Sequence, residues 1–421
     1  MKTIKINHIG KTEGHLSFEG TLQNGDIASA RVMTLEGARL MEGIILNRHY
    51  HDVPIITSRI CGVCPIVHNL GAIKALEDAM DVKPTKDAIL LRKILNLGQL
   101  LHSHALHVVF LSFPDFIGVS NNFDLIKKYP NEVQLALDVH AWAIKLNTLV
   151  GGRNTHPINS VVGGFKVEPD KEDFEKLLND LDEIIPKALK LINFVKKYSK
   201  VPKFENPTDY VSLIKKNEYA LYTGKLYSSE LKHLIPTKKY FHDFEEQYDN
   251  GEAVKRVKHM GSTYMVGALA RINNSFEHLH PIAKKTWESL KIKTPCYNSF
   301  YNSLAQAVEM VHSFEELTVL MKDYLKIKNP KLYVPVTPKA GMGISAIEAP
   351  RGTLYHYYEL NEKGYVTHGN IITPTAMFLA NIEFDLEKLL PEIQHLPDEK
   401  QKLLIKTLIR AYDPCISCAT H

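Results

Sequence analysis

The sequence predicts a mainly α-helical fold with small β elements. Several long stretches carry apolar residues at helical spacing, which indicates helices with one buried face. The first 35 residues instead alternate apolar and polar side chains, as strands do. A third stretch, residues 343–375, alternates similarly around Pro-Arg-Gly and is predicted to be a hairpin joined to a loop. The sequence has no internal repeat or obvious linker, so we expect a single domain over residues 1–421.

The predicted elements follow in chain order. Residues 1–35 form a β-rich N-terminal segment, a strand pair with Asn24-Gly25-Asp26 at its turn. From about residue 36 the chain becomes helical, with Thr85 as the N-cap of the first long helix. Ser313 and Glu316 have the spacing of a capping box, which predicts a helix start at Ser313. Residues 200–260 are polar, aromatic and irregular, an α/β insertion with short strands. The predicted helices cover residues 84–113, 131–150, 171–199, 313–327 and 398–412.

Composition excludes some classes of protein. The net charge of +4 is spread over scattered lysines, so we expect no nucleic-acid partner. The N-terminus has no apolar signal core. No apolar run approaches the 18–20 residues, roughly, that span a bilayer, so no direct membrane span is expected. We expect a cytoplasmic protein, or one exported only with a partner.

Four of the five cysteines lie in two Cys-x-x-Cys pairs at opposite ends of the chain. Cys61 and Cys64 lie in "RICGVCPIVH", and Cys415 and Cys418 lie in "DPCISCATH", which ends on the last residue. In a large chain without a secretory signal, this pattern favours metal or redox chemistry over disulfides. If the pairs share a metal, the two ends of the fold must converge.

Three interpretations of the pairs are open on spacing alone. They could be unrelated buried thiols, a structural zinc site of four cysteines, or a catalytic soft-metal centre. Structural zinc sites usually hold a short local segment, whereas some 350 residues separate positions 64 and 415. Charged and titratable neighbours of the thiols, such as Arg59 and Asp413, favour a centre that handles protons and electrons.

The two motifs strongly resemble the signatures of nickel–iron hydrogenase large subunits. Further blocks are similar to that family in the same order along the whole chain, although "KTEGH" has a lysine where the family has arginine. These blocks are "KTEGH" (11–15), "EGARLMEGIIL" (36–46), "SHALH" (103–107), "GGRNTHP" (151–157), "VGALARIN" (266–273) and "EAPRG" (348–352). The resemblance implies the family fold, a long helix bundle around a buried metal site.

The resemblance also implies the ligands of that site. Cys61, Cys64, Cys415 and Cys418 would bind nickel, with Cys64 and Cys418 bridging to iron. The iron would carry two cyanides and one carbon monoxide. Soft thiolates suit such metals.

By the same resemblance, Glu13 would be the proton gate that serves the terminal thiolate of Cys415, and Arg351 would lie over the open side of the cluster. Either Cys415 or Arg351 could act as the base. Asp115 and Asp413 would be the carboxylates that hold Arg351.

Other residues would support the centre. Thr375, with the Arg351 region, would donate hydrogen bonds to the cyanides. His68 is expected to hold the first thiol loop. His104 and His107 could be core histidines or part of a proton path; neither is favoured.

A magnesium site is implied as well, formed by Glu42, the Ile371 carbonyl and His421. The family is made with a tail that a protease removes after this histidine. A chain that ends on His421 is therefore expected to be the processed form.

Cys296 alone cannot hold an iron–sulfur cluster, which normally takes four ligands. Electrons from H2 would therefore leave through a small subunit that carries iron–sulfur clusters. The resemblance is greatest to soluble cytoplasmic groups, whose further partners are flavin- and NAD(P)-binding subunits with more iron–sulfur clusters. The acceptor itself stays open.

Two alternatives to a hydrogenase catalytic subunit are kept. One is a regulatory sensor of hydrogen with the same ligands. The other, from a different class, is a structural four-cysteine zinc protein.

Overall fold

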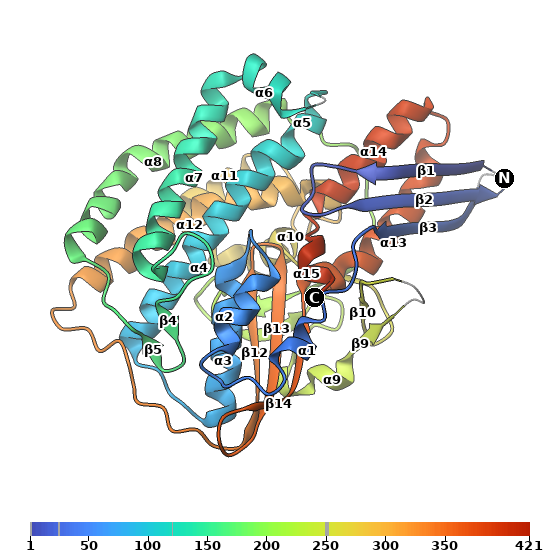
Figure 1. Cartoon of the computed structure of the whole chain (residues 1–421). Helices are drawn as coiled ribbons and strands as arrows, with labels where there is room; N and C mark the ends of the chain where they lie inside the picture. Colours follow the sequence, from blue (N-terminus) through green and yellow to red (C-terminus); the bar gives the residue numbers. More distant parts are fainter. Residues whose placement is uncertain (1, 24–25, 120, 249–251) are drawn as a thin grey trace.

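The helical part of the computed structural model is a bundle of long helices that lie side by side (Figure 1). The structure describes residues 2–23, 26–119, 121–248 and 252–421. The bundle consists of α4 (Lys86–Leu106), α7 (Pro130–Gly151), α8 (Lys171–Tyr198) and α12 (Asn302–Leu325). The predicted fold class, mainly α with small sheets, is confirmed.

The long helices begin mostly where the sequence predicts. The hydroxyl oxygen of Thr85 accepts a hydrogen bond from the Ala88 amide at 3.0 Å and so caps α4, as expected. The predicted helix start at Ser313 is wrong, because α12 begins eleven residues earlier, at Asn302. The Ser313 hydroxyl donates back to the Glu309 carbonyl inside the helix. The first turns of α12 are almost wholly buried, so they lack the polar face that marks an amphipathic helix.

The N-terminal segment is a three-stranded antiparallel sheet, one strand more than predicted. Its strands are β1 (Lys2–Ile9), β2 (Leu16–Gln23) and β3 (Asp26–Thr34). The predicted pair is β2 with β3; the turn residues Asn24 and Gly25 lie outside the described residues. This sheet packs against α13 (Pro374–Ile393), so the N-terminal strands lie beside the C-terminal helices (Figure 1).

The predicted hairpin near residue 350 belongs to a second antiparallel sheet of three strands. These are β12 (Gly341–Ala349), β13 (Gly352–Leu360) and β14 (Val366–Ile372). Helix α3 (Pro65–Met80) packs directly on β12 and β13. Its close approach requires glycine at position 343, where an added Cβ would lie 2.1 Å from the Ala75 carbonyl oxygen.

Short strands and one short helix occur in residues 200–260, where the sequence predicts an irregular α/β insertion, and they continue to residue 265. A four-stranded sheet has the order β11-β6-β7-β8, and β9 and β10 form a separate hairpin. The elements are β6 (Asp209–Ile214), β7 (Lys225–Ser228), β8 (His233–Ile235), α9 (Tyr240–Asp243), β9 (Phe244–Gln247), β10 (Arg256–His259) and β11 (Tyr264–Met265).

Short elements complete the described chain. These are α1 (Met41–Ile45), α2 (Val53–Thr57), α5 (Phe113–Phe116), α6 (Asn122–Lys128), β4 (Ser160–Val161), β5 (Gly164–Phe165), α10 (Ala268–Ser275), α11 (Pro281–Glu288), α14 (Asp398–Ala411) and α15 (Ile416–Ala419).

One helical run is long enough and apolar enough to cross a membrane, although the sequence predicts no membrane span. It extends from Lys86 to Phe116 through α4, a π-helical turn and α5. Its most apolar window is 78% buried inside the fold. Its apolar character is therefore that of a core helix.

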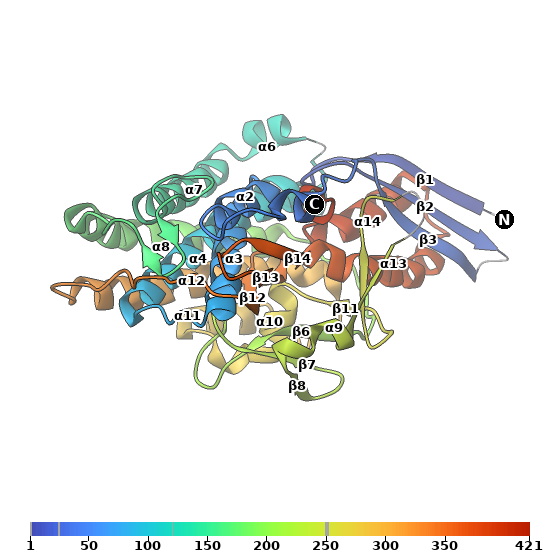
Figure 2. The same cartoon turned by 60° about the horizontal axis from the view of Figure 1, so that its bottom comes forward.

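Segments from the two ends of the chain meet, as the shared-metal hypothesis requires. The C-terminus lies near α1, toward the end of the N-terminal sheet that is opposite to the N-terminus (Figure 1), and Figure 2 shows the same separation of N and C. Residue Glu13 forms a parallel bridge with Cys415, and its carbonyl accepts a hydrogen bond from the Ile416 amide at 3.0 Å.

Candidate metal centre

Each cysteine pair lies where a loop leads into a helix: Cys61 and Cys64 precede α3, whereas Cys415 precedes α15 and Cys418 lies within it; the two segments are called the first and second thiol loops below. Cys64 is the N-cap residue of α3, whose first position is Pro65, and Cys415 is the N-cap residue of α15. Proline at the first helical position fixes the backbone where no amide hydrogen is needed. The second loop is preceded by Asp413 in a left-handed conformation, φ 57°, which aspartate tolerates better than most residues. Helix starts also favour thiolates, because unpaired amides point toward them.

The four thiols converge at one buried point. Their sulfur atoms all lie within 4.8 Å of one another. Cys61 is 3.4 Å from Cys415, Cys64 is 3.3 Å from Cys418, and Cys415 is 3.0 Å from Cys418 (sulfur to sulfur). The amides of Val63 and Cys64 donate to the Cys61 sulfur at 3.3 and 3.2 Å. Four soft donors in this arrangement can hold one metal ion between the two ends of the chain.

The four thiols divide by the direction of their pKa shifts: those of Cys61 and Cys415 are lowered, whereas those of Cys64 and Cys418 are raised. Burial opposes ionisation of Cys415, but hydrogen bonds from Cys418 and Cys64 outweigh it and lower the pKa to about 7. Burial also opposes the charge on Arg351, yet Asp413 and the thiolates hold the pKa of this guanidinium well above its usual range. The site therefore carries both the negative ligands and a fixed cation beside them.

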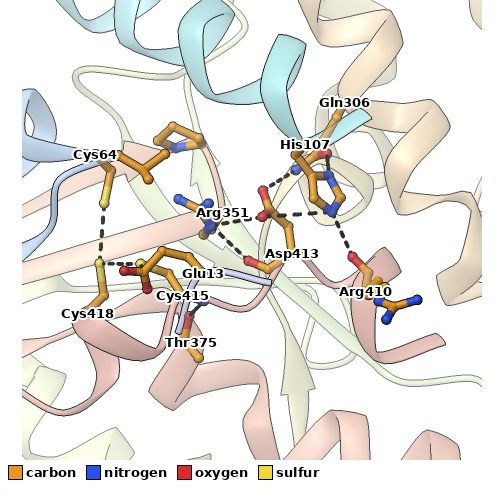
Figure 3. Close-up of polar contacts among 12 residues, drawn as sticks. Glu13, Cys64, His107, Gln306, Arg351, Thr375, Arg410, Asp413, Cys415 and Cys418 are labelled. Atoms are coloured by element: carbon orange, nitrogen blue, oxygen red, sulfur yellow. Dashed lines mark hydrogen bonds and ion pairs between the residues drawn. The ribbon is translucent and has the colours of Figure 1, made fainter. Parts of the chain in front are cut away.

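Arg351 is held by Asp413 and by part of the helix bundle (Figure 3). Its Nε donates to the Asp413 carbonyl at 2.9 Å and lies 3.1 Å from the Asp413 carboxylate. That carboxylate also accepts from Gln306 at 3.0 Å. His107 contacts Gln306, and its Nε2 is 2.7 Å from the Arg410 carbonyl, so its ring helps to hold this network. His104 is bound to Glu309 at 2.9 Å, which places it in the core network.

The predicted role of Asp115 needs correction. Its carboxylate does not contact Arg351; it binds Lys11 at 2.5 Å and Arg410 at 2.6 Å. Lys11 lies on the N-terminal segment and Arg410 on α14. Of the two predicted aspartates, Asp413 is therefore the one that binds Arg351. The Nε2 of His68 lies 3.6 Å from the Cys418 sulfur, so its ring contacts the second cysteine pair. Its role in holding the first thiol loop stays a prediction.

Glu13 reaches the thiols from the turn between β1 and β2. Its Oε2 is 3.1 Å from the Cys415 sulfur and accepts from the Ser417 amide at 2.9 Å. The Ser417 hydroxyl donates to the other carboxylate oxygen. Burial, and then the charge of Cys415, raise the pKa of Glu13 to about 7. Ser417 is not among the site residues expected from the sequence. Its position between Cys415 and Cys418 is the one sequence feature that could have indicated it.

Buried nitrogen atoms beside the site lack a protein partner among the described residues. They include Nη1 of Arg351 and Nδ1 of His68, and both residues line the small cavity at the thiols. This cavity lies beside Cys64 and Cys418 and is also lined by Thr375. Unpaired buried donors are costly, so this side of the site fits small anionic ligands on a metal. Thr375 itself accepts a hydrogen bond from the Cys415 amide at 2.9 Å, which holds the second loop.

The residues predicted to bind magnesium also lie together. His421 Nε2 is 2.8 Å from the Ile371 carbonyl oxygen and 3.9 Å from a Glu42 carboxylate oxygen. The same Glu42 oxygen accepts from the Ile371 amide at 2.8 Å. The other ring nitrogen of His421 faces the Cys418 carbonyl. This second group therefore lies directly against the second thiol loop.

Comparison with known proteins agrees with this geometry. A family model described as "nickel-dependent hydrogenase" matches residues 39–134 and 219–421. The chain is 31% identical to the alpha subunit of sulfhydrogenase 1 from Pyrococcus furiosus, covering 99% of this chain and 97% of that protein. It is 30% identical to the alpha subunit of sulfhydrogenase 2 from the same organism, covering 99% and 98%.

The fold also matches a solved structure, an NAD+-reducing [NiFe]-hydrogenase in the H2-reduced state. The TM-score is 0.90, each chain is covered completely, and the sequences are 24% identical. The family model covers more than half of the chain, and the motifs that carry the resemblance meet at one buried point. The chain belongs to the nickel-dependent hydrogenase family.

Proposed function

We propose that this chain is the catalytic subunit of a heteromeric [NiFe] hydrogenase that splits H2 into protons and electrons. The observation that carries the proposal is the convergence of Cys61, Cys64, Cys415 and Cys418 at a point that Glu13 and Arg351 both border. The nickel–iron group, with cyanide and carbonyl on its iron, would supply the polarisation of H2 when bound. Its ligands would be the four thiolates, with Cys64 and Cys418 shared with iron.

The protein residues would manage the proton. The Cys415 sulfur lies in hydrogen-bonding contact with Glu13 Oε2, so a proton on this thiol can pass to the carboxylate. The Ser417 amide and hydroxyl fix the carboxylate in that position. A carboxyl with a pKa of about 7 can both accept and release a proton near neutrality. Arg351, held by Asp413, would keep a positive charge over the thiolates.

The electrons would leave through a small subunit with iron–sulfur clusters. With four of five cysteines committed, Cys296 alone cannot hold such a cluster. Both sulfhydrogenase relatives are named as alpha subunits, which are components of larger enzymes. The likeness to an NAD+-reducing enzyme supports further flavin- and NAD(P)-binding subunits with more iron–sulfur clusters, and a cytoplasmic location. A hydrogen sensor remains the second candidate, since it would keep the same ligands. The single-domain boundaries stay a prediction.

Infrared spectroscopy and metal analysis of the purified complex test the proposal. We expect cyanide and carbonyl stretching bands and about one nickel for each set of four thiolates, with iron in excess of nickel because the partner subunits would carry iron–sulfur clusters. Turnover of H2 with a soluble acceptor would separate an enzyme from a sensor. Zinc in place of nickel, without those bands, would contradict the proposal.

We also propose that Glu42, the Ile371 carbonyl and His421 bind Mg²⁺. Burial lowers the pKa of His421, and a neutral imidazole carries one hydrogen, yet both ring nitrogens face carbonyl oxygens. The nitrogen without a hydrogen therefore points its lone pair at a carbonyl oxygen, which is repulsive. A cation bound between the two atoms would remove this repulsion. Adjacent ligands of octahedral magnesium lie about 3 Å apart, close to the 2.8 Å between His421 and Ile371.

Glu42→Gln is expected to remove this magnesium, because a neutral amide replaces the one anionic ligand of the set. The magnesium content of the complex, measured after dialysis against a chelator, should fall from about one ion per chain to a small fraction. Glu362→Gln is the matched control, an exposed carboxylate in the turn after β13. Equal magnesium in both variants would remove Glu42 from the site.

A further inference from the structure

Arg39 lies between the two thiol loops and contacts both. Its Nη2 donates to the Ile60 carbonyl at 2.5 Å and also to the Ser417 carbonyl. Ile60 comes directly before Cys61, and Ser417 directly before Cys418. Among the described residues, Arg39 is the one side chain other than the cysteines that hydrogen-bonds to both loops. A single guanidinium thus joins segments that are hundreds of residues apart in the sequence.

The backbone of the same residue holds the chain end. The Arg39 amide donates to the Thr420 carbonyl at 2.7 Å. The contacts of Arg39 therefore fall on both sides of Cys418. The Cys415 amide is held separately by Thr375, and Ile416 by Glu13. Arg39 is the contact that ties the last residues of the second loop to the first loop.

The charge of Arg39 has no protein counter-ion in the described part of the chain. No carboxylate forms an ion pair with it, and its Nε is buried without a partner. The two backbone carbonyls, of Ile60 and Ser417, are therefore the acceptors that the structure shows for this half-buried guanidinium.

We infer that Arg39 is a positioning residue that fixes the two thiol loops against each other through the carbonyls of Ile60 and Ser417. The guanidinium holds its donors in a rigid planar fork, whereas the ammonium of lysine is a compact point charge on a flexible stem and would not place its donors at the same position. The inference rests on the proposed function in one respect, that a metal occupies the four thiolates.

The test compares Arg39→Met and Arg39→Lys with the wild type in the purified complex. Arg48→Met is the matched control, since Arg48 lies on the same segment but is exposed and contacts only the Ile44 carbonyl through its side chain. The first measurement is amide hydrogen exchange of residues 416–421, and the second is nickel per chain. Infrared band positions are the third.

Loss of two charge-assisted hydrogen bonds predicts exchange about tenfold faster or more in residues 416–421 of Arg39→Met. Its nickel content is expected to fall to about half or less, because the second loop no longer holds its thiols in place. Arg39→Lys should be intermediate, and any nickel centre that it retains should show shifted infrared bands. Arg48→Met should match the wild type.

Wild-type exchange and nickel content in Arg39→Met would overturn the inference. If that variant cannot be purified, wild-type exchange and band positions in Arg39→Lys would overturn it instead. Failure of the proposed function has a different signature, which is the absence of cyanide and carbonyl bands from the wild type. The exchange measurement would still report on the loops in that case.

Discussion

Cys415→Ser is expected to leave a folded chain that holds little nickel and shows no measurable H2 turnover. The Cys415 sulfur contacts Cys61, Cys418 and Glu13, so it is both a proposed ligand and the proposed proton donor to the carboxylate. A serine hydroxyl is a hard, weakly acidic group that binds nickel poorly. Loss of groups that only orient a ligand costs about 10–100-fold in metal affinity or activity, and loss of a ligand should cost more.

The measurement pairs nickel content with H2 oxidation in the purified complex. Cys296→Ser is the matched control, because Cys296 is also buried but lies outside the cluster of four thiols. Its thiol carries a pKa raised by burial to about 11, so it stays protonated and does not act as a ligand. A Cys415→Ser enzyme with full nickel and wild-type turnover would exclude the assignment.

The sequence predicted the parts of the fold that local pattern determines. Thr85 caps α4 as expected, because an N-cap side chain binds a backbone amide only a few residues further along the chain. The start of α12 was missed since residues 302–312 are buried on every side and show no amphipathic stripe. The spacing of Ser313 and Glu316 imitates a cap, but the serine is satisfied by the carbonyl one turn before it.

The partners of charged residues at the site depend on tertiary placement. The sequence could indicate that Asp115 and Asp413 belong near a cation, but not which one. Asp115, Lys11 and Arg410 lie on three segments that are distant in the sequence and meet only in the folded chain. Of the two aspartates, Asp413 is the one that contacts Arg351. The convergence of the thiol pairs, in contrast, was predictable from the residue types, because four soft ligands can share one metal only if they lie together.

Glu13→Gln is expected to stop proton transfer while the metal centre still assembles. The amide keeps the size of the carboxylate and can still contact Ser417, but it cannot take a proton from the Cys415 thiol. General acid–base groups contribute on the order of 10²–10⁴-fold, so H2 oxidation and hydrogen–deuterium exchange should fall by about 100-fold or more. Nickel content and infrared bands should stay close to those of the wild type.

A carboxylate of the same sheet provides the control for this variant. Glu19 on β2 is partly exposed and pairs with Lys5 rather than with the thiols, so Glu19→Gln should exchange hydrogen at the wild-type rate. The two variants together separate a role in proton transfer from a general effect of removing negative charge near the N-terminus. Because Glu13 contributes no metal ligand in the proposed centre, slow exchange with full nickel would locate the defect in the proton path. Wild-type exchange in Glu13→Gln would instead leave solvent as the proton acceptor for Cys415, and the role of Glu13 would then be to hold Ser417 in place.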